Sequence, residues 1–519
     1  MPEYLHPGVY IEEIERGPRP IEGVATSTAA FLGETERGST KPRLVTSYND
    51  YKRWFGGVFG ASKYIPYAVS GFFENGGRRA FISRIVANPA QAATATFGDL
   101  IVDAVGPGFF GNRVFVEIKA STTTVPDTTQ DPPVPVPVGF RVQVAYWSSV
   151  PSGFTPFNPI TDTKTFPRPA LVEDFDDLVF DEASADYFAK RVNNNSALIA
   201  LRLVASPAQP PNVPASAGLL ANGNDSGGAP TSADFKGESN DVDKKTGLDA
   251  LLLDDYREVA LVYEPGITDK AFVVDLITHC ENQRFRFAVI DCEPNVGNPG
   301  DLDPRTKLQE SQYAAFYYPW IWIADPQTGA RRRVPPGGHM LGIYARTDIE
   351  RGVFKAPANE VVRGALDLEF AINESAQDLL NPRGVNAIRN FPGRGTLLWG
   401  ARTLSSNSLW KYVSVRRLFI FLEHSIYDGT QWVVFEPNDE RLWARVIDTI
   451  TLFLRSQYRA GALMGATEKE AFFVTCDRTT MTQDDILNGR LVCEIGIAPV
   501  RPAEFVIFRI FQNTAEPQQ

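Results

Sequence analysis

Two apolar, strand-like segments near the ends of this chain limit what it can fold into. Residues 8–15 read Gly-Val-Tyr-Ile-Glu-Glu-Ile-Glu, which alternates apolar and acidic side chains as a β-strand does. Residues 505–511 read Phe-Val-Ile-Phe-Arg-Ile-Phe, an almost continuous apolar run. A strand outside a compact core has a free edge, and a free apolar edge pairs readily with another chain. We therefore expect a subunit that joins its neighbours by adding strands to their sheets.

These two segments are named here the N-terminal arm and the C-terminal arm. The residues expected to make the inter-subunit contacts are Val9, Tyr10, Ile11, Glu12 and Ile14 in the N-terminal arm, and Phe505, Val506, Ile507, Phe508, Ile510 and Phe511 in the C-terminal arm.

Composition excludes several classes of protein. The net charge of −11 argues against binding to nucleic acid or to an anionic membrane, because both favour a basic surface. No run approaches the roughly 18 consecutive apolar residues of a transmembrane helix, so we expect no direct membrane insertion. The first residues lack the basic and apolar regions of a signal peptide, which predicts synthesis in the cytoplasm. Four cysteines are too few for a disulfide framework and are predicted to be buried, reduced thiols.

The order of apolar runs predicts a mixed α/β, multidomain fold of the α+β type. A strand from residue 29, helices at 49–57 and 64–75 and a strand at 79–86 are followed, after residue 248, by alternating helices and strands, which is typical of a parallel or mixed sheet. The intervening stretch has short alternating strands and long Pro- and Gly-rich loops, and it is predicted to be an inserted, mostly β, outward-facing domain. The predicted domains are 1–28 (N-terminal arm and linker), 29–90 with 246–400 (α/β middle domain), 91–245 (inserted domain) and 401–519 (C-terminal core with its arm).

No sequence pattern points to an active site, a metal site or a cofactor. None of the four histidines has the spacing of a zinc-hydrolase motif, and His279, Cys280 and Glu281 are adjacent, so on a helix their side chains point apart. No Gly-x-Ser-x-Gly motif occurs. The glycine-rich stretch 106–113 lacks the lysine and hydroxyl of a phosphate-binding loop and is predicted to be a turn.

Two charged clusters allow a structural and a functional interpretation. The acidic residues 173–177 are predicted to form the first turn of a helix, favoured by the helix dipole, with a catalytic carboxylate pair as the alternative. Arg331, Arg332 and Arg333 are predicted to lie in a solvated loop, with contact to an acidic neighbour as the alternative.

A long amphipathic helix is predicted at residues 438–460. Leu442, Val446, Ile450, Phe453 and Leu454 form one apolar stripe, and the charged side chains lie elsewhere around the helix.

Several motifs, in this order along the chain, resemble those of contractile tail sheath proteins. They include the N-terminal Pro-Gly-Val-Tyr-Ile-Glu-Glu and the Phe-Glu-Pro-Asn that precedes the long helix. The matching segments are residues 7–13, 19–21, 24–33, 106–113, 381–386, 399–403, 412–418, 435–438 and 461–463.

The resemblance implies a structural sheath subunit of a phage tail or a phage-tail-like contractile injection particle. Such subunits are expected to stack as hexameric rings around an inner tube, to exchange N- and C-terminal strands with neighbours, and to drive the tube through a target membrane on contraction. The implied partners are further copies of the chain, the inner tube protein, and baseplate and cap or terminator proteins. The subunit is expected to assemble in the cytoplasm and to become part of a phage tail or of a phage-tail-like particle that is released from the cell.

The same resemblance makes the long helix the candidate for contact with the inner tube, through Arg441, Arg445, Asp448 and Arg455. A short helix predicted at 482–488 competes for this role. The other functional hypotheses are an α/β enzyme with a β insertion and an unidentified active site, and a tube or baseplate protein. A tube subunit would be shorter and mainly β, and a type VI secretion sheath is usually divided between two chains.

Overall fold

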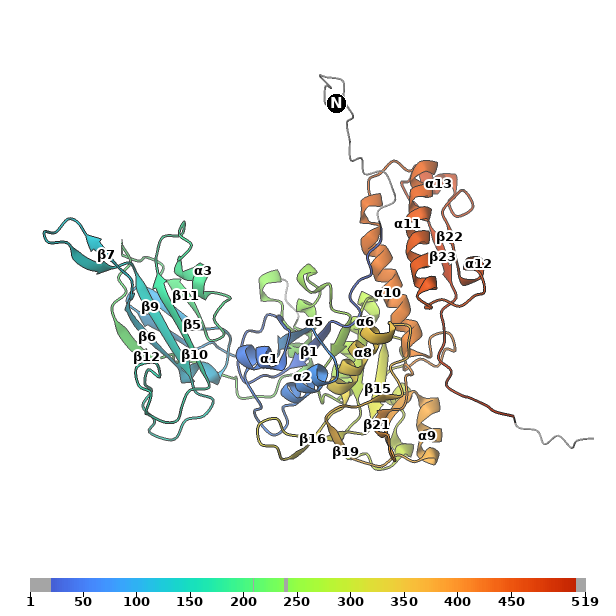
Figure 1. Ribbon diagram of the computed structural model, residues 1–519, viewed down its shortest axis with the longest axis horizontal. Helices are drawn as coiled ribbons and strands as arrows, with labels where there is room; N and C mark the ends of the chain where they lie inside the picture. Colours follow the sequence, from blue (N-terminus) through green and yellow to red (C-terminus); the bar gives the residue numbers. More distant parts are fainter. Residues whose placement is uncertain (1–19, 209, 238–240, 510–519) are drawn as a thin grey trace, which may run out of the picture. The chain divides into compact units, whose positions relative to one another are not determined.

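The computed structural model describes residues 20–208, 210–237 and 241–509 (Figure 1). The N-terminal arm residues, and Ile510 and Phe511 of the C-terminal arm, lie outside the described residues. The chain divides into two compact units. The larger unit consists of Ala25–Arg351 and Lys355–Val413, and the smaller unit of the residues up to Val24, Gly352–Phe354 and those from Ser414 onward. The predicted mixed α/β class is confirmed, whereas the four predicted domain boundaries stay predictions.

A nine-stranded sheet is the largest sheet of the larger unit. Its order is β18-β21-β20-β15-β14-β13-β1-β3-β2, and the strands from β20 to β3 run parallel. Every residue of β1, β3, β14 and β15 is buried, as expected for a parallel sheet covered by helices. The bounds are β1 Ala29–Gly33, β2 Arg43–Val45, β3 Ala80–Arg84, β13 Leu261–Tyr263, β14 Phe287–Asp291, β15 Ala314–Tyr318, β18 Glu360–Val361, β20 Val385–Phe391 and β21 Gly395–Leu398.

Helices α2, α6 and α8 pack against this sheet. The first helix begins one residue earlier than the predicted start at residue 49. Ser47 caps α1 by accepting a hydrogen bond from the Asp50 amide at 3.1 Å, and Asp269 caps α6. The helices of the larger unit are α1 Tyr48–Phe55, α2 Ile65–Glu74, α3 Phe188–Val192, α4 Ser232–Lys236, α5 Gly247–Ala250, α6 Lys270–Gln283, α7 Pro304–Lys307, α8 Gly337–Arg351 and α9 Glu374–Leu380.

Two smaller sheets between β3 and α4 share one apolar core. One has the order β10-β9-β6-β12 and the other β11-β5-β4, and all their pairings are antiparallel. The predicted turn at 106–113 contains the 3-10 helix Phe109–Arg113 and leads into β6. The bounds are β4 Thr94–Phe97, β5 Leu100–Ala104, β6 Val114–Ala120, β9 Phe140–Tyr146, β10 Leu171–Leu178, β11 Ile199–Leu203 and β12 Ser216–Leu219.

Three polar or proline-rich segments form strands, contrary to prediction. The acidic residues 173–177 belong to β10 and not to a helix, because β9 supplies both backbone pairing and an arginine partner. Part of the Pro-rich sequence predicted to be a loop in the inserted domain forms β8 (Val134–Pro137), which pairs with β7 (Thr124–Asp127) in an exposed hairpin. Residues 331–333 lie in β17 (Arg331–Val334), which pairs with β16 (Ile321–Ala324) beside β19 (Ala365–Leu368), so the predicted loop was wrong.

The smaller unit contains two long helices and one short sheet (Figure 1). Leu442, Val446, Ile450, Phe453 and Leu454 of α11 are all buried, which confirms the predicted apolar stripe. Helix α10 packs on this stripe, with the Phe421 and Phe453 ring centroids 6.0 Å apart. The bounds are α10 Val413–Gly429, α11 Glu440–Arg459, α12 Glu468–Ala471, β22 Phe472–Thr475, α13 Gln483–Leu487 and β23 Glu494–Ile497. Among the described residues, no helix combines the length and the apolar character needed to cross a bilayer.

Candidate assembly surfaces

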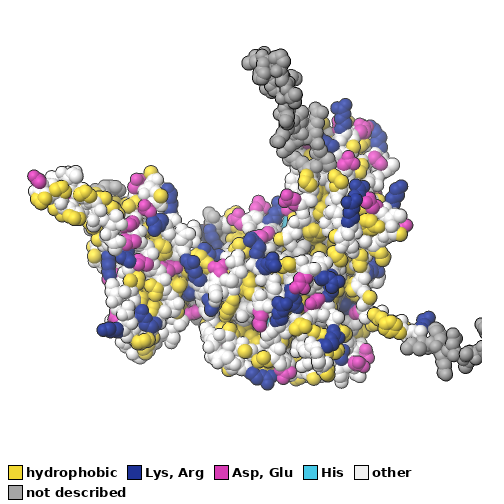
Figure 2. Space-filling view, in the orientation of Figure 1, with side chains coloured by type: hydrophobic (Ala, Val, Ile, Leu, Met, Phe, Trp, Pro, Cys, Tyr) yellow, Lys and Arg dark blue, Asp and Glu magenta, His cyan; other side chains and the backbone are white. Residues whose placement is uncertain are grey.

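The described part of the C-terminal arm presents four apolar side chains to solvent. Residues 505, 506, 507 and 508 are 71, 68, 78 and 84% exposed. Figure 2 shows a hydrophobic stretch where the chain passes into the grey C-terminal residues. These four residues have no regular secondary structure in a single subunit, so their part in strand exchange stays a prediction. Contiguous exposed apolar surface of this kind marks a site that another surface covers.

The sheet of the smaller unit has free edges. Strands β22 and β23 are antiparallel, with Phe472 opposite Ile497 and Thr475 opposite Glu494. Within the described chain this sheet has no third strand. The side chain of Phe473 is 55% exposed although it lies in the middle of the unit's only described ladder. A two-stranded sheet is marginally stable in water, and its free edges are templates for further strands.

The four candidate tube-contact residues lie on α11 but differ in their surroundings. Arg445 forms an ion pair with Glu436 at 2.9 Å, and half-buried Arg455 forms one with Glu468 at 2.9 Å. Arg441 and Asp448 are exposed and form no ion pair with any residue that the structure describes. Of the four candidates, only Arg441 and Asp448 therefore carry a charge that no ion pair within the described residues neutralises.

An exposed phenylalanine precedes α11 in a strained conformation. Phe435 has a φ of 68°, which lies in the left-handed region that bulky side chains rarely adopt. Its side chain is fully exposed and neighbouring Val434 is 60% exposed. Phe435 begins the Phe-Glu-Pro-Asn motif, but neither Phe435 nor Val434 was predicted to contact a neighbouring subunit. The available signal was the unbroken apolar run at residues 432–435, just before the helix cap.

A groove borders the first half of α11. It has a volume of about 410 Å³ and lies between the helix and the turn that follows β22. Trp443, Ala444, Ile447 and Cys476 form most of its apolar lining. At its rim, Arg478 forms an ion pair with Glu440 at 2.8 Å.

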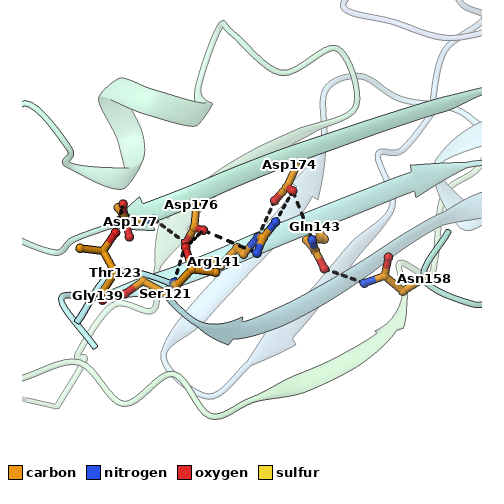
Figure 3. A network of polar contacts seen from close by, with 10 residues as sticks. Ser121, Thr123, Gly139, Arg141, Gln143, Asn158, Asp174, Asp176 and Asp177 are labelled. Atoms are coloured by element: carbon orange, nitrogen blue, oxygen red, sulfur yellow. Dashed lines mark hydrogen bonds and ion pairs between the residues drawn. The ribbon is translucent and has the colours of Figure 1, made fainter. Parts of the chain in front are cut away.

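The acidic strand β10 is held by polar partners from neighbouring segments (Figure 3). Arg141 of β9 donates to both carboxylate oxygens of Asp174, at 2.8 and 2.5 Å, and this pairing lowers the pKa of Asp174. Asp176 accepts from the Thr122 hydroxyl at 2.6 Å and Asp177 from the Thr123 hydroxyl at 2.8 Å. These carboxylates hold β10 to its neighbouring segments, so their clustering is explained without a catalytic pair.

The larger unit contains a polar cavity whose charged side chains form hydrogen bonds within the unit. It has a volume of about 510 Å³ and is lined by Glu36, Arg84 and Asp225, among others. Arg84 donates to the carbonyls of Gly38 and Pro107, at 2.9 and 2.7 Å, and burial lowers its pKa to about 10. Glu36 accepts a hydrogen bond from the Tyr146 hydroxyl at 2.7 Å. The side chains around this cavity therefore join loops and strands of the unit to one another.

Two buried titratable groups of the larger unit are also explained by packing. His279 lies 2.8 Å from the Arg286 guanidinium, and burial lowers the pKa of His279 to about 3. Asp291 accepts from the Tyr263 hydroxyl at 2.5 Å and from the Gly337 amide at the start of α8 at 2.9 Å, and burial raises its pKa to about 6. Within the described ranges, no group of three His, Cys, Asp or Glu side chains is placed to hold a metal ion.

Two family models match adjoining parts of the chain. The phage tail sheath protein central domain matches residues 243–404, and the phage tail sheath C-terminal domain matches residues 405–513. A protein described as a prophage major tail sheath protein from Pseudomonas aeruginosa is 25% identical over 280 residues, which are 51% of this chain and 69% of that protein. The tail sheath protein of Vibrio phage KVP40 is 27% identical over 208 residues, which are 39% of this chain but 30% of that protein.

Solved structures share the fold over nearly the whole chain. The sheath of an extracellular contractile injection system (PVC), in its contracted state, has a TM-score of 0.60 at 23% identity and covers 99% of each chain. The contracted helical sheath of the anti-feeding prophage has a TM-score of 0.56 at 24% identity, covering 98% of this chain and 99% of the other.

Proposed function

Because this chain belongs to the phage tail sheath protein family, we propose that it polymerises as stacked hexameric rings around an inner tube and contracts to drive that tube through a target membrane. It is a structural sheath subunit of a contractile injection system, and its relatives are structural proteins and not enzymes. In this proposal both arms insert into neighbouring subunits and keep them joined while the rings rearrange.

The observation that carries the proposal is that one unit contains both a segment that could be donated as a strand and a sheet edge that could accept one. Residues 505–508 are an exposed apolar segment, and the β22–β23 sheet in the same smaller unit has free edges. A strand from one copy that pairs with the sheet of the next makes a contact between two different surfaces, which propagates from subunit to subunit and does not close on itself.

The energy of one arm explains why two arms are needed. Burial of a large apolar side chain stabilises by roughly 1.5–3 kcal/mol, so residues 505–508 contribute at most about 6–12 kcal/mol. Association of two proteins costs roughly 4–15 kcal/mol in lost freedom. One arm alone is therefore marginal, and we expect polymerisation to require both arms, with Val434 and Phe435 adding further apolar contact between subunits.

The test is polymerisation of the full chain and of two truncations. Electron microscopy of the full chain should reveal long hollow tubes with a six-fold end view. A chain ending at Glu504 should stay monomeric, whereas the matched control ending at Asn513 keeps residues 505–511 and should still form tubes. Deletion of residues 1–16 should also abolish tubes. A monodisperse full-length monomer at high concentration would refute the proposal.

We propose that α11 contacts the inner tube through Arg441 and Asp448. Their exposure and the lack of an internal ion pair among the described residues support this choice over Arg445 and Arg455. Arg441→Glu should abolish co-assembly with the tube protein while tubes of sheath alone persist. Unchanged co-assembly would transfer the role to the competing helix α13.

The remaining partners and the position of the β-rich region follow from the same proposal. Residues 91–245 are proposed to lie on the outside of the sheath, where the exposed hairpin β7–β8 does not obstruct the tube. Baseplate and cap or terminator proteins are the proposed partners at the two ends. The particle is proposed to assemble in the cytoplasm and to act as a phage tail or as a released phage-tail-like particle.

A further inference from the structure

Two cysteines face each other across the free-edged sheet of the smaller unit. The ladder of β22 and β23 ends with Thr475 opposite Glu494, so the next facing pair is Cys476 and Cys493. The two thiols are close enough for each to affect the pKa of the other. Both belong to the core that packs on α11, but Cys493 is only half-buried, which differs from the predicted burial of all four cysteines.

The ladder also fixes the type of this pair. The Ala498 amide donates to the Ala471 carbonyl at 2.8 Å, which marks these two as a hydrogen-bonded pair. Hydrogen-bonded and non-hydrogen-bonded pairs alternate along an antiparallel ladder, so counting along the register makes Cys476 and Cys493 a non-hydrogen-bonded pair. The Cα atoms of such pairs lie about 4.5 Å apart, within the roughly 4.4–6.8 Å that a disulfide spans.

We propose that Cys476 and Cys493 are a redox pair that forms a disulfide across the β22–β23 sheet when the protein meets an oxidised low-molecular-weight disulfide such as oxidised glutathione. In the first step the Cys493 thiolate attacks one sulfur of oxidised glutathione and releases one glutathione thiolate. In the second step the Cys476 thiolate attacks the Cys493 sulfur and releases the other. The two protons lost by the cysteines end on two glutathione thiols, so the protein loses two electrons and the oxidant gains them.

Access and reactivity set the rate of this reaction. Cys493 is half-buried, and Cys476 borders the groove beside Trp443, so both sulfurs lie at the margin of the core. Burial raises the pKa of Cys493 to about 12, which leaves little thiolate at neutral pH. We therefore expect slow oxidation, with a rate that rises about tenfold per pH unit below that pKa.

The disulfide would close the loop that contains α13, the competing candidate for contact with the inner tube. Residues 477–492 leave the sheet at Cys476 and return at Cys493, and they contain α13. A disulfide would tie the two ends of this excursion together and fix the end of the acceptor sheet. The assembled subunit would thus differ between a reducing cytoplasm and an oxidising extracellular medium.

The test uses the unmodified full chain and needs no assay of assembly. The protein is incubated with oxidised glutathione at pH 7 and pH 9, unfolded in an alkylating reagent, and analysed by peptide mass spectrometry. We expect two of the four alkylatable thiols to be lost and a peptide cross-linked between Cys476 and Cys493 to appear. The cross-link should form faster at pH 9 than at pH 7, and dithiothreitol should restore both thiols.

The control is Cys493→Ser, which should lose no thiol to an intramolecular bond. Its circular dichroism and thermal midpoint show whether it folds, and the wild-type measurement stands if it does not. Four alkylatable thiols after oxidation, a stable glutathione adduct without the cross-link, or a bond that involves Cys280 or Cys292 would each overturn the proposal.

Discussion

The Nε atom of Arg455 lies 2.9 and 3.0 Å from the two carboxylate oxygens of Glu468, which joins α11 to α12. Arg455 was a candidate for contact with the inner tube, yet its charge is already matched within the smaller unit. We expect Arg455→Glu to lower the free energy of unfolding by about 1 kcal/mol, because the pair is partly exposed and its reversal sets two carboxylates side by side. Arg441→Glu, the control on the same helix, should leave the thermal midpoint unchanged. Equal destabilisation by both substitutions would contradict this distinction.

Asp291 should make the larger unit less stable as pH rises from about 4 to 6. Its pKa of about 6 in the folded protein lies above the roughly 3.9 of an unfolded chain, so the folded state holds the proton more tightly. The stability from this group is complete below about pH 4 and is lost as pH rises through 6, by about 3 kcal/mol. Denaturant unfolding of wild type and Asp291→Asn at several pH values measures the difference. Parallel pH profiles for the two proteins would show that Asp291 does not titrate in this range.

Gly338 in α8 should tolerate no side chain. A Cβ atom there would lie 2.4–2.7 Å from backbone atoms of Ala68 in α2, and backbone cannot move aside as a flexible side chain can. We expect Gly338→Ala to lower the free energy of unfolding by about 1–3 kcal/mol. Gly228→Ala is the matched control, because no atom lies within 4 Å of its added Cβ. A Gly338→Ala protein as stable as this control would mean that the two helices separate easily.

Phe435→Asn should strengthen the monomer and weaken the polymer. Asparagine adopts the left-handed region more readily than phenylalanine, so relief of strain should raise the free energy of unfolding by about 1 kcal/mol. Loss of the exposed ring should raise the protein concentration needed for tube formation. Val434→Asn has no strain to relieve and should change only polymerisation. Thermal unfolding and sedimentation of polymer distinguish the two effects, and unchanged sedimentation in both variants would argue that this turn stays exposed in the sheath.

The sequence predicted best those elements whose signal is local. Strand β1 and the apolar face of α11 were recognised because a buried run and a helical stripe need no knowledge of their partners. The resemblance to sheath proteins, carried by short motifs in a fixed order, was confirmed by the family models.

The failures share a non-local cause. The acidic strand β10 depends on Arg141 and on two threonines about fifty residues away, which no window of sequence contains. The arginines of β17 lie in a strand because β16 pairs with them, and Arg333 also forms an ion pair with Glu369 at 2.6 Å. Likewise, the facing of Cys476 and Cys493 follows from the register of two strands and not from their spacing.

The smaller unit holds both the exposed apolar segment 505–508 and the free-edged β22–β23 sheet, and under the proposed strand exchange this has a consequence for damaged or truncated molecules. A subunit without residues 505–508 keeps β22 and β23. Under the proposed strand exchange it would still receive a neighbour's C-terminal arm but would offer no C-terminal arm in return. Such a molecule would occupy a growing end and prevent further addition. A small fraction of truncated chain should therefore stop the growth of many tubes. The mean length of the tubes would then measure the fraction of intact subunits.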